Sequence, residues 1–277
     1  MFLVYNSDIL HESDFRLSIN DRAFSYGDGI FETIRYESKR IWFWSDHFAR
    51  LSVGMTALGL TPPENFTVDS LHQTLLRLVD ANGLTNQPAR IKLQVWRQAG
   101  GLYTPTTNNV NVLISARPGN PFSISEKDRA GIYDDFRLSH SPISACKTLN
   151  ALPYILAGVY KEQHSLDDVL LLDTDGHMAE CMASTLFWYT SQTLYTPSLR
   201  TGCINGIIRR RLLRLASAFD ITVTEGLYKP EALQQAEAVF CANVMGIQWL
   251  NQVENCIINT SETAKEQLLP LLNQLHI

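Results

Sequence analysis

The sequence has few charged residues and no long run of like charges or of apolar side chains. Asp, Glu, Lys and Arg make up 18% of its 277 residues, and the formal net charge is −5. A nucleic-acid-binding surface needs clustered Lys and Arg to neutralise phosphates, so this composition argues against a nucleic-acid partner. No segment approaches the roughly 18 unbroken apolar residues that span a bilayer. We therefore expect no membrane partner either.

Features of secreted and metal-binding proteins are also lacking. Residues 1–10 have no basic flank followed by a long apolar stretch, as a signal peptide would. The cysteines are scattered, odd in number and without a CxxC pair; they are Cys146, Cys181, Cys203, Cys241 and Cys256. This pattern is typical of reduced thiols, and the seven histidines show no HxxxH spacing. We predict a cytoplasmic protein with no metal site.

The length and the 45% hydrophobic content fit two globular domains better than one small domain. Segment 116–123, ARPGNPFS, contains two prolines and a glycine, which interrupt any regular element. It is the best candidate linker. We therefore predict a smaller N-terminal α/β domain over residues 1–117 and a larger C-terminal domain over residues 118–277.

The spacing of apolar residues predicts both strands and helices, and hence a mixed α+β fold. In the first domain it predicts strands over 2–6, 29–37, 40–44, 89–96 and 110–116, with Ser38-Lys39 joining the second to the third, and helices over about 46–58 and 68–82. In the second domain it predicts a helix from about Asn150, a hairpin of 169–173 and 178–189 around Asp175-Gly176, and a helix from Gly206.

One of the seven lysines differs from the others in its surroundings. Lys147 follows the uncharged stretch SPISAC and directly precedes the apolar segment LNALPYILAGV. Partial desolvation there would lower its pKa and free the neutral amine to condense with an aldehyde. The other six are expected to be solvated charges, as most lysines are: Lys39, Lys92, Lys127, Lys161, Lys229 and Lys265.

A loop that leads into a predicted helix provides a candidate anion site. It spans residues 201–209, TGCINGIIR, and free N–H groups at such a helix start attract anions. The glycine at 206 would let the backbone approach the anion closely. An Asn205 cap on an ordinary helix would explain the same residues. Arg209, Arg210 and Arg211 are most simply the solvated face of that helix.

Glu180 lies on a predicted strand among apolar neighbours, Met178, Ala179, Cys181 and Met182. An unpaired buried carboxylate is costly, so this residue needs a partner. A protonated pyridine nitrogen would serve, and a nearby arginine would serve equally well. A lysine, an anion cradle and a buried acid are together what pyridoxal phosphate requires.

At these residues the chain resembles the class IV aminotransferase family, which comprises the fold-type IV pyridoxal-phosphate enzymes. The resemblance covers nearly the whole chain and rests on DRAFSYGDGIFETIR (21–35), HFARL (47–51), KTLN (147–150), LLLDTDGHMAECMASTLFW (170–188) and TGCINGIIR (201–209). It implies a two-domain D-amino-acid-aminotransferase-like fold, with the lysine in the larger C-terminal domain. It also implies a homodimer with the active site near the interface.

The resemblance implies a role for each matched residue. Lys147 matches the lysine that holds pyridoxal 5'-phosphate as a Schiff base, and Glu180 matches the acid that pairs with the pyridine nitrogen. Arg50 matches the arginine that grips the cofactor phosphate. Ile207 and Ile208 match the pair whose backbone N–H groups hold that phosphate, although many aminotransferases have threonine at the second position. Asn243 is a further expected cofactor contact.

Within the family, local features resemble 4-amino-4-deoxychorismate lyases more than aminotransferases. The asparagine in INGI (204–207), the stretch AECMASTLFW (179–188) and CANVMGI (241–247) are lyase-like. They favour conversion of aminodeoxychorismate to 4-aminobenzoate and pyruvate, a step of folate precursor synthesis. A branched-chain or D-amino-acid aminotransferase using 2-oxoglutarate and glutamate is the alternative. Arg97 and Phe31 are expected substrate contacts, although Arg97 would equally fit a solvent-facing arginine.

Overall fold

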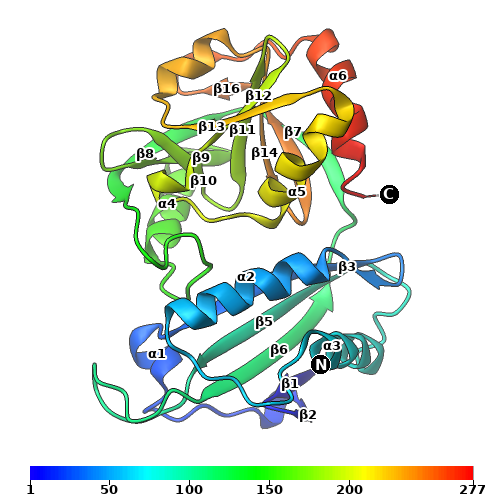
Figure 1. The fold of residues 1–277 in the computed structure, drawn as a ribbon, viewed down its shortest axis with the longest axis vertical. Helices are drawn as coiled ribbons and strands as arrows, with labels where there is room; N and C mark the ends of the chain where they lie inside the picture. Colours follow the sequence, from blue (N-terminus) through cyan, green and yellow to red (C-terminus); the bar gives the residue numbers. More distant parts are fainter. Residues whose placement is uncertain (277) are drawn as a thin grey trace. The chain divides into compact units, whose positions relative to one another are not determined.

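The computed structural model of the chain describes residues 1–276. Contacts along the chain divide it into two compact units, each of which contains helices and strands (Figure 1). The first unit comprises Met1–Pro121 together with Cys146–Asn150, and the second comprises Phe122–Ala145 and the chain from Ala151 onward. The first break therefore lies four residues beyond the one that we predicted. Lys147 belongs to the first unit, not to the C-terminal domain where we expected it.

The first unit is built on one antiparallel sheet with strand order β2-β1-β6-β5-β3-β4. Its strands are β1 (Phe2–Tyr5), β2 (Asp8–His11), β3 (Gly29–Glu37), β4 (Arg40–Ile41), β5 (Ala89–Arg97) and β6 (Val110–Pro118). Its helices are α1 (Arg22–Tyr26), α2 (Trp44–Ala57), α3 (Val68–Ala81) and the short 3-10 turn Glu12–Asp14. The strands predicted over 2–6, 29–37, 89–96 and 110–116 and the helix over 68–82 are confirmed within one or two residues.

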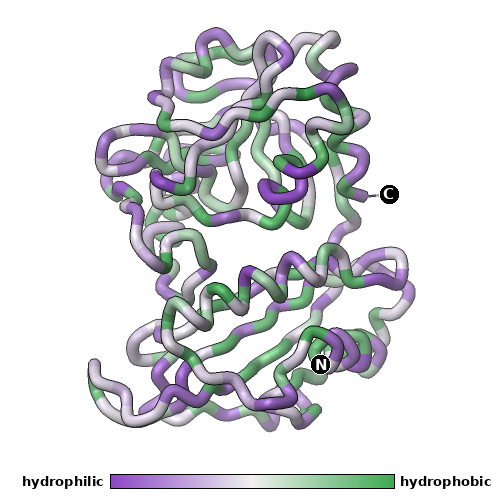
Figure 2. The backbone as a smooth tube through the Cα atoms, in the orientation of Figure 1, coloured by the Kyte–Doolittle hydropathy of each residue, from purple (hydrophilic) through white to green (hydrophobic). Residues whose placement is uncertain are grey.

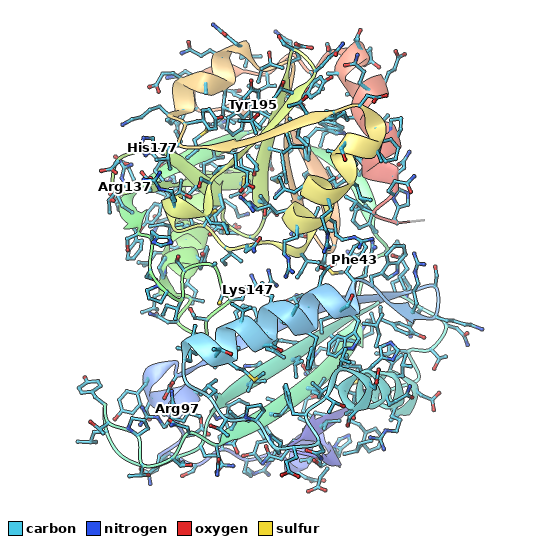
Figure 3. All side chains as sticks on the ribbon, in the orientation of Figure 1. Phe43, Arg97, Arg137, Lys147, His177 and Tyr195 are labelled. Atoms are coloured by element: carbon cyan, nitrogen blue, oxygen red, sulfur yellow. The ribbon has the colours of Figure 1, made fainter. Side chains whose placement is uncertain are left out.

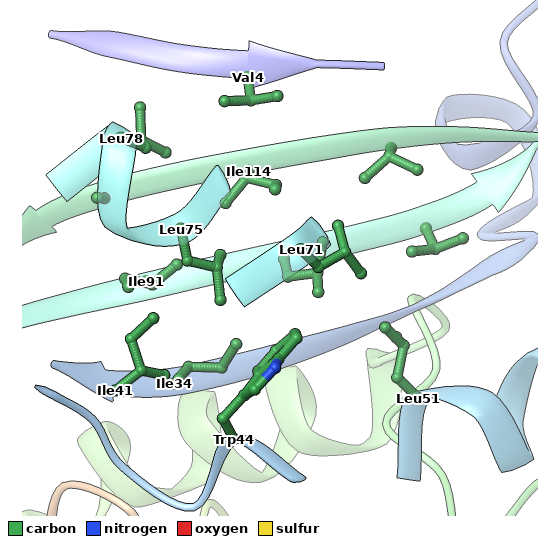
Figure 4. Close-up of a cluster of buried hydrophobic side chains, with 14 of the residues drawn as sticks. Val4, Ile34, Ile41, Trp44, Leu51, Leu71, Leu75, Leu78, Ile91 and Ile114 are labelled. Atoms are coloured by element: carbon green, nitrogen blue, oxygen red, sulfur yellow. The ribbon is translucent and has the colours of Figure 1, made fainter. Parts of the chain in front are cut away.

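The core of the first unit lies on one face of this sheet, where α2 and α3 pack (Figure 4). The alternation of β5 explains the arrangement, because Ile91, Leu93 and Val95 are fully buried whereas Arg90 and Lys92 point to the other side. Helix α3 begins at the cap Thr67, whose side chain accepts a hydrogen bond from the Ser70 N–H.

The strand predicted over 40–44 ends early, at Ile41. Ser38 and Lys39 both have positive φ (54° and 61°), which gives the tight β3–β4 hairpin that was expected at these residues. Phe43 then adopts a left-handed conformation with φ 54°, and α2 begins at Trp44. The aromatic run therefore ends a strand and starts a helix, because one residue with unusual backbone geometry turns the chain.

The second unit holds two sheets, of order β10-β9-β8-β16-β17 and β13-β12-β11-β14-β15-β7. The strands are β7 (Ser123–Lys127), β8 (Ala130–Leu138), β9 (Asp168–Asp173), β10 (Met178–Cys181), β11 (Thr185–Thr190), β12 (Thr193–Pro197), β13 (Thr222–Gly226), β14 (Ala238–Asn243), β15 (Gly246–Leu250), β16 (Gln252–Val253) and β17 (Cys256–Ile257). The helices are α4 (Leu152–Gln163), α5 (Ile207–Leu215) and α6 (Glu262–Asn273), with 3-10 segments at Leu199–Thr201, Ala216–Phe219 and Pro230–Gln235.

Strand β9 has a buried residue at every position, and it is largely hydrophobic along its length (Figure 2). Leu170 and Leu172 belong to the core that includes residues of β11 and β14, whereas Val169 and Leu171 pack with residues of α4. A strand covered on both faces loses the polar alternation of a half-exposed one. This explains the unbroken apolar run that we expected to be a strand.

The predicted hairpin of 169–173 and 178–189 is only half correct. Strands β9 and β10 do pair antiparallel, with Gly176 at φ 79° in the turn. After Cys181, however, the chain turns, and β11 joins the other sheet between β12 and β14. The largely apolar sequence of 178–189 hides this change of sheet because both strands are buried. No helix among residues 1–276 is long and apolar enough to cross a membrane.

Candidate active site

Lys147 sits on a short segment that extends the sheet of the first unit. The Lys147 carbonyl accepts a hydrogen bond from the Phe31 N–H (2.8 Å), and the Leu149 N–H donates to the Gly29 carbonyl (2.8 Å). These bonds pair residues 147–149 with β3 along the part of that strand that β4 does not reach. The lysine backbone is thereby fixed, although it lies in a loop by local sequence.

The Lys147 side chain is half-buried, and its Nζ lies 5.0 Å from the centroid of the Phe31 ring. Figure 3 labels it in the first unit. Gly54 of α2 lets Cys146, the residue before Lys147, pack closely, because a Cβ at Gly54 would lie 3.0 Å from Ile30 and 3.4 Å from Cys146. Phe31, the expected substrate contact, therefore lies next to the amine, at a distance typical of an amine–ring contact.

Arg50 is held by Glu32, an acid on β3. Its Nε donates to Glu32 Oε1 (2.7 Å) and its Nη2 to Oε2 (2.5 Å), and His47 Nδ1 lies 2.6 Å from the same Oε2. Glu32, His47 and Arg50 are all buried. Burial alone would raise the pKa of Glu32, but the Arg50 charge and the hydrogen bonds from His47 and Arg50 lower it to about 2.

His47 is fully buried, and burial lowers its pKa more than the neighbouring Glu32 raises it. It is therefore neutral at pH 7 and serves as a hydrogen-bond donor to Glu32. Glu32 alternates along β3 with Ile30 and Ile34, which places it on the face covered by α2. Arg50, on α2, is thus fixed in orientation; its contact with a phosphate stays a prediction.

Arg97 does not face solvent, and its guanidinium is already hydrogen-bonded within the protein. It is 7% exposed, its Nε donates to Asp28 (3.0 Å), its Nη2 donates to the Leu58 carbonyl (2.6 Å) and its Nη1 donates to Asn108. Asp28 also accepts a hydrogen bond from Arg22 (2.7 Å). This buried network at the end of β5 (Figure 3) gives Arg97 a structural role, and its contact with a substrate stays a prediction.

Lys92 is the cation that faces Phe31 instead. Its Nζ lies 5.1 Å from the centroid of the Phe31 ring, so Lys92 and Lys147 both approach the same side chain. Partial burial lowers the pKa of Lys92, and Arg90 lowers it further. Lys92 was expected to be an ordinary solvated charge; only its cross-strand position next to Phe31, set by the β3–β5 pairing, distinguishes it.

In the second unit, Glu180 is 4% exposed and accepts two hydrogen bonds. The Tyr154 hydroxyl donates to Oε1 (2.7 Å) and the Ile204 N–H donates to Oε2 (3.2 Å). Burial raises the pKa of Tyr154, and the Glu180 charge raises it further, so the phenol keeps its proton. The expectation that this carboxylate needs partners is confirmed, because a phenol and a backbone amide both donate to it.

The loop before α5 ends at Gly206, which is the helix cap and has no side-chain capping bond. The Asn205 cap that we considered is therefore wrong. Ile207 and Ile208 are buried in the first turn, where backbone N–H groups have no intrahelical acceptor. A Cβ at Gly206 would lie 2.5 Å from Thr185 Oγ1, so a larger residue would not fit. This turn has the chemistry of an anion cradle and suits a phosphate.

Arg209 is buried, contrary to the solvated face that we expected for it. It donates to the Pro197 carbonyl (3.0 Å) and pairs with Glu225. Asn243, at the end of β14, donates to the Ala183 carbonyl (3.2 Å) and to Ser184 (3.0 Å). Its side chain thus holds the turn that follows the Glu180 strand, and its contact with a cofactor stays a prediction.

Each unit therefore carries part of the predicted chemistry. The first has Lys147, whose amine would condense with an aldehyde, and an oriented Arg50. The second has the buried Glu180 for a protonated ring nitrogen and the α5 start for a phosphate. These donors and acceptors fit pyridoxal phosphate, which needs all of them.

Comparison with known proteins agrees with this chemistry. The family model "Amino-transferase class IV" matches residues 29–249. The chain is 25% identical to an aminodeoxychorismate lyase of Vibrio harveyi, over 83% of this chain and 84% of that protein. It is equally 25% identical to a branched-chain-amino-acid aminotransferase of Escherichia coli K12, over 86% of this chain and 80% of that protein.

Solved structures resemble the chain along its length. A protein of Legionella pneumophila assigned as a 4-amino-4-deoxychorismate lyase gives a TM-score of 0.85 at 25% identity, over 95% of this chain and 97% of that one. A hypothetical aminotransferase of Mycobacterium tuberculosis, in a form with bound α-ketoglutarate and PMP, gives 0.82 at 17% identity, over 100% of this chain and 99% of that one. The expected D-amino-acid-aminotransferase-like fold type IV is confirmed.

Proposed function

We propose that this chain, which belongs to the class IV aminotransferase family, is a lyase that converts 4-amino-4-deoxychorismate to 4-aminobenzoate and pyruvate. It is an enzyme of that family, and its cofactor is pyridoxal 5'-phosphate. Its relatives include both lyases and aminotransferases at the same identity, so they do not separate the two activities. A branched-chain or D-amino-acid aminotransferase is the alternative.

The observation that carries the lyase proposal is the pair of amines on Phe31. Lys92 and Lys147 each place Nζ about 5 Å from this ring. Aminodeoxychorismate has two carboxylates on a ring-bearing skeleton, and a cation next to the reactive lysine would bind one of them. A branched-chain amino acid has one carboxylate and an apolar side chain, so an exposed ammonium next to Phe31 would not favour it.

Each residue then has a defined task. Bound pyridoxal phosphate supplies an electron sink for the carbon that loses a proton. Lys147 holds the cofactor and moves that proton; Glu180 keeps a proton on the ring nitrogen. Arg50 and the N–H groups of Ile207 and Ile208 bind the phosphate. Loss of the enolpyruvyl group as pyruvate leaves an aromatic ring, and this product fits a role in folate precursor synthesis.

The experiment compares two reactions of the same holoenzyme. Pyruvate release from aminodeoxychorismate should exceed, by orders of magnitude, transamination of branched-chain or D-amino acids with 2-oxoglutarate. Lys92→Gln should raise KM for aminodeoxychorismate and leave the cofactor absorbance unchanged, whereas Arg90→Gln, on the same face of β5, should change neither. Rapid transamination without pyruvate release from aminodeoxychorismate would establish the alternative.

We also propose a homodimer with the active site near the interface, supported by the outward face of α4. Leu152, Ile155, Leu156 and Val159 recur at helical spacing and are 46–62% exposed. Such a stripe is the apolar centre that a stable protein interface needs. Helix α4 carries Tyr154, which bonds Glu180, so a partner bound there would lie near that carboxylate. A cytoplasmic location fits the five free thiols.

A further inference from the structure

The proposed function uses Glu180 but does not explain the phenol that is bonded to it. Tyr154 lies in the first turn of α4, and its ring packs against the buried cluster that includes Ala157, Leu171 and Ala179. Its hydroxyl donates to Glu180 Oε1 at 2.7 Å, a short bond of the charge-assisted kind. A tyrosine needed only for packing would not require this geometry.

We propose that Tyr154 is a positioning residue that holds Glu180 as an oriented anion and thereby sets the protonation of the cofactor's pyridine nitrogen. This inference rests on the proposed function, because it assumes that Glu180 faces that nitrogen.

The first step of the argument is orientation. Tyr154 bonds one carboxylate oxygen of Glu180, and the Ile204 N–H bonds the other at 3.2 Å. Two donors from different elements, α4 and the loop before α5, fix the rotation of the carboxylate about its last torsion. With only one donor the carboxylate would rotate, because the last torsion of a glutamate side chain has a broad range of values when nothing fixes it.

The second step is charge. Hydrogen bonds to the ionised form of an acid favour that form. If Glu180 and a ring nitrogen share a proton, a donor on the carboxylate shifts that proton towards nitrogen. Burial, and then the Glu180 charge, raises the pKa of Tyr154, so the hydroxyl stays a donor across the working pH range. Removing it would return the proton towards Glu180 and weaken the electron sink.

A further titratable neighbour, Cys203, does not compete for this proton. Burial raises the pKa of Cys203 to about 12, and the Glu180 charge contributes to the rise, so its thiol is neutral at pH 7. The charge of Arg209 acts on Cys203 as well, but this guanidinium is paired with Glu225 and bonded to the Pro197 carbonyl. Tyr154 is thus the side chain whose removal tests the proposal directly.

The experiment measures the ring nitrogen itself. The apoenzyme is reconstituted with cofactor labelled with 15N in the pyridine ring, and the 15N chemical shift is compared between wild type and Tyr154→Phe. We expect the shift to move towards the unprotonated value in Tyr154→Phe, and pyruvate release to fall about tenfold, the effect of one hydrogen bond to a charged group. Tyr160→Phe, on the same helix, is the matched control and should match wild type in both measurements.

Glu180→Gln separates this inference from the proposed function. A change of the 15N shift in Glu180→Gln with none in Tyr154→Phe would overturn the role of Tyr154 alone. No change in Glu180→Gln, or a wild-type protein that does not bind the cofactor, would overturn the function assigned to the site. If Tyr154→Phe does not fold, 3-fluorotyrosine placed at 154 keeps the ring and makes the phenol a stronger donor. If the 15N shift with 3-fluorotyrosine at 154 differs from the 15N shift with the analogue at 160, the proposal is supported. Identical shifts would contradict it.

Discussion

The chemistry that we propose for the chain depends on the amine of Lys147. Its backbone is bonded to β3 on both sides, and its Nζ faces Phe31. Lys147→Ala should abolish the yellow absorbance of the holoenzyme and leave the circular dichroism spectrum unchanged. Lys265→Ala, a surface lysine on α6, is the control and should stay yellow. Borohydride reduction followed by peptide mapping to a lysine other than 147 would contradict the assignment.

The Glu32–Arg50 pair predicts a pH dependence of stability. The pKa of Glu32 is about 2 in the folded protein against an ordinary value of 4.5. Above about pH 4.5 the acid is ionised in both states and the pair contributes fully. As the pH falls towards 2, only the unfolded chain takes up the proton, so the contribution is lost.

Glu32→Gln removes this dependence. The difference in unfolding free energy between wild type and variant should shrink by about 3 kcal/mol between pH 7 and pH 2, the order of magnitude given by the lowered pKa. Urea unfolding followed across this range measures it, and comparison with the variant cancels the other carboxylates. A difference that stays constant with pH would show that Arg50 does not hold Glu32 ionised.

Residue types alone indicated Lys147 and Glu180 as candidate reactive groups but did not predict the partners of their side chains. Both residues stood out because their immediate neighbours are apolar. Lys127 did not, although its Nζ lies 2.6 Å from the buried Asp168, 41 residues away. The polar residues around Lys127 suggest a solvated lysine. The ion pair cannot be predicted from them, because the acid that is buried with the lysine is distant along the chain.

At the scale of elements, periodicity located most strands and helices. Alternation was sufficient for β5, and helical spacing was sufficient for α3. Periodicity failed to locate the elements in two places. In one, a single residue, Phe43, changes the direction of the chain; in the other, two buried strands, β10 and β11, follow each other in different sheets. The first error arises from the left-handed backbone of Phe43, which its residue type does not signal. The second arises because burial removes the polar alternation that marks where one element ends.

The start of α5 gives a prediction of its own. Gly206→Ala would place a Cβ 2.5 Å from Thr185 Oγ1, so the turn would have to move away from its present position. We expect the dissociation constant for pyridoxal phosphate to rise about tenfold, the effect of roughly one lost amide contact. Absorbance titration of the apoenzyme measures it.

A second substitution tests the cause of this effect. Thr185→Ala removes the atom that the new methyl group would meet, so the double variant should recover most of the lost affinity. If the double variant binds as weakly as Gly206→Ala alone, then the steric explanation is wrong.

At the scale of the whole molecule, the exposed stripe of α4 predicts the oligomeric state. Light scattering should give twice the 31.3 kDa of one chain. Leu156→Asp, in the middle of the stripe, should give monomers, because burying an unpaired carboxylate in an apolar interface is unfavourable. Val53→Asp, an exposed apolar position on α2, is the control and should leave the dimer intact. A monomeric wild type at micromolar concentration would contradict the proposal.

The segment that carries Lys147 also affects the folding of the protein during its synthesis. Residues 1–121 are synthesised first, yet their sheet has an uncovered edge along β3 until residues 146–150 follow. At typical translation speeds this interval lasts roughly one to six seconds. During that time the bare edge can pair with other extended chains. The segment with Lys147, the proposed Schiff-base lysine, therefore also covers this edge of the N-terminal sheet, and it is made only after the linker and the first strands of the second unit.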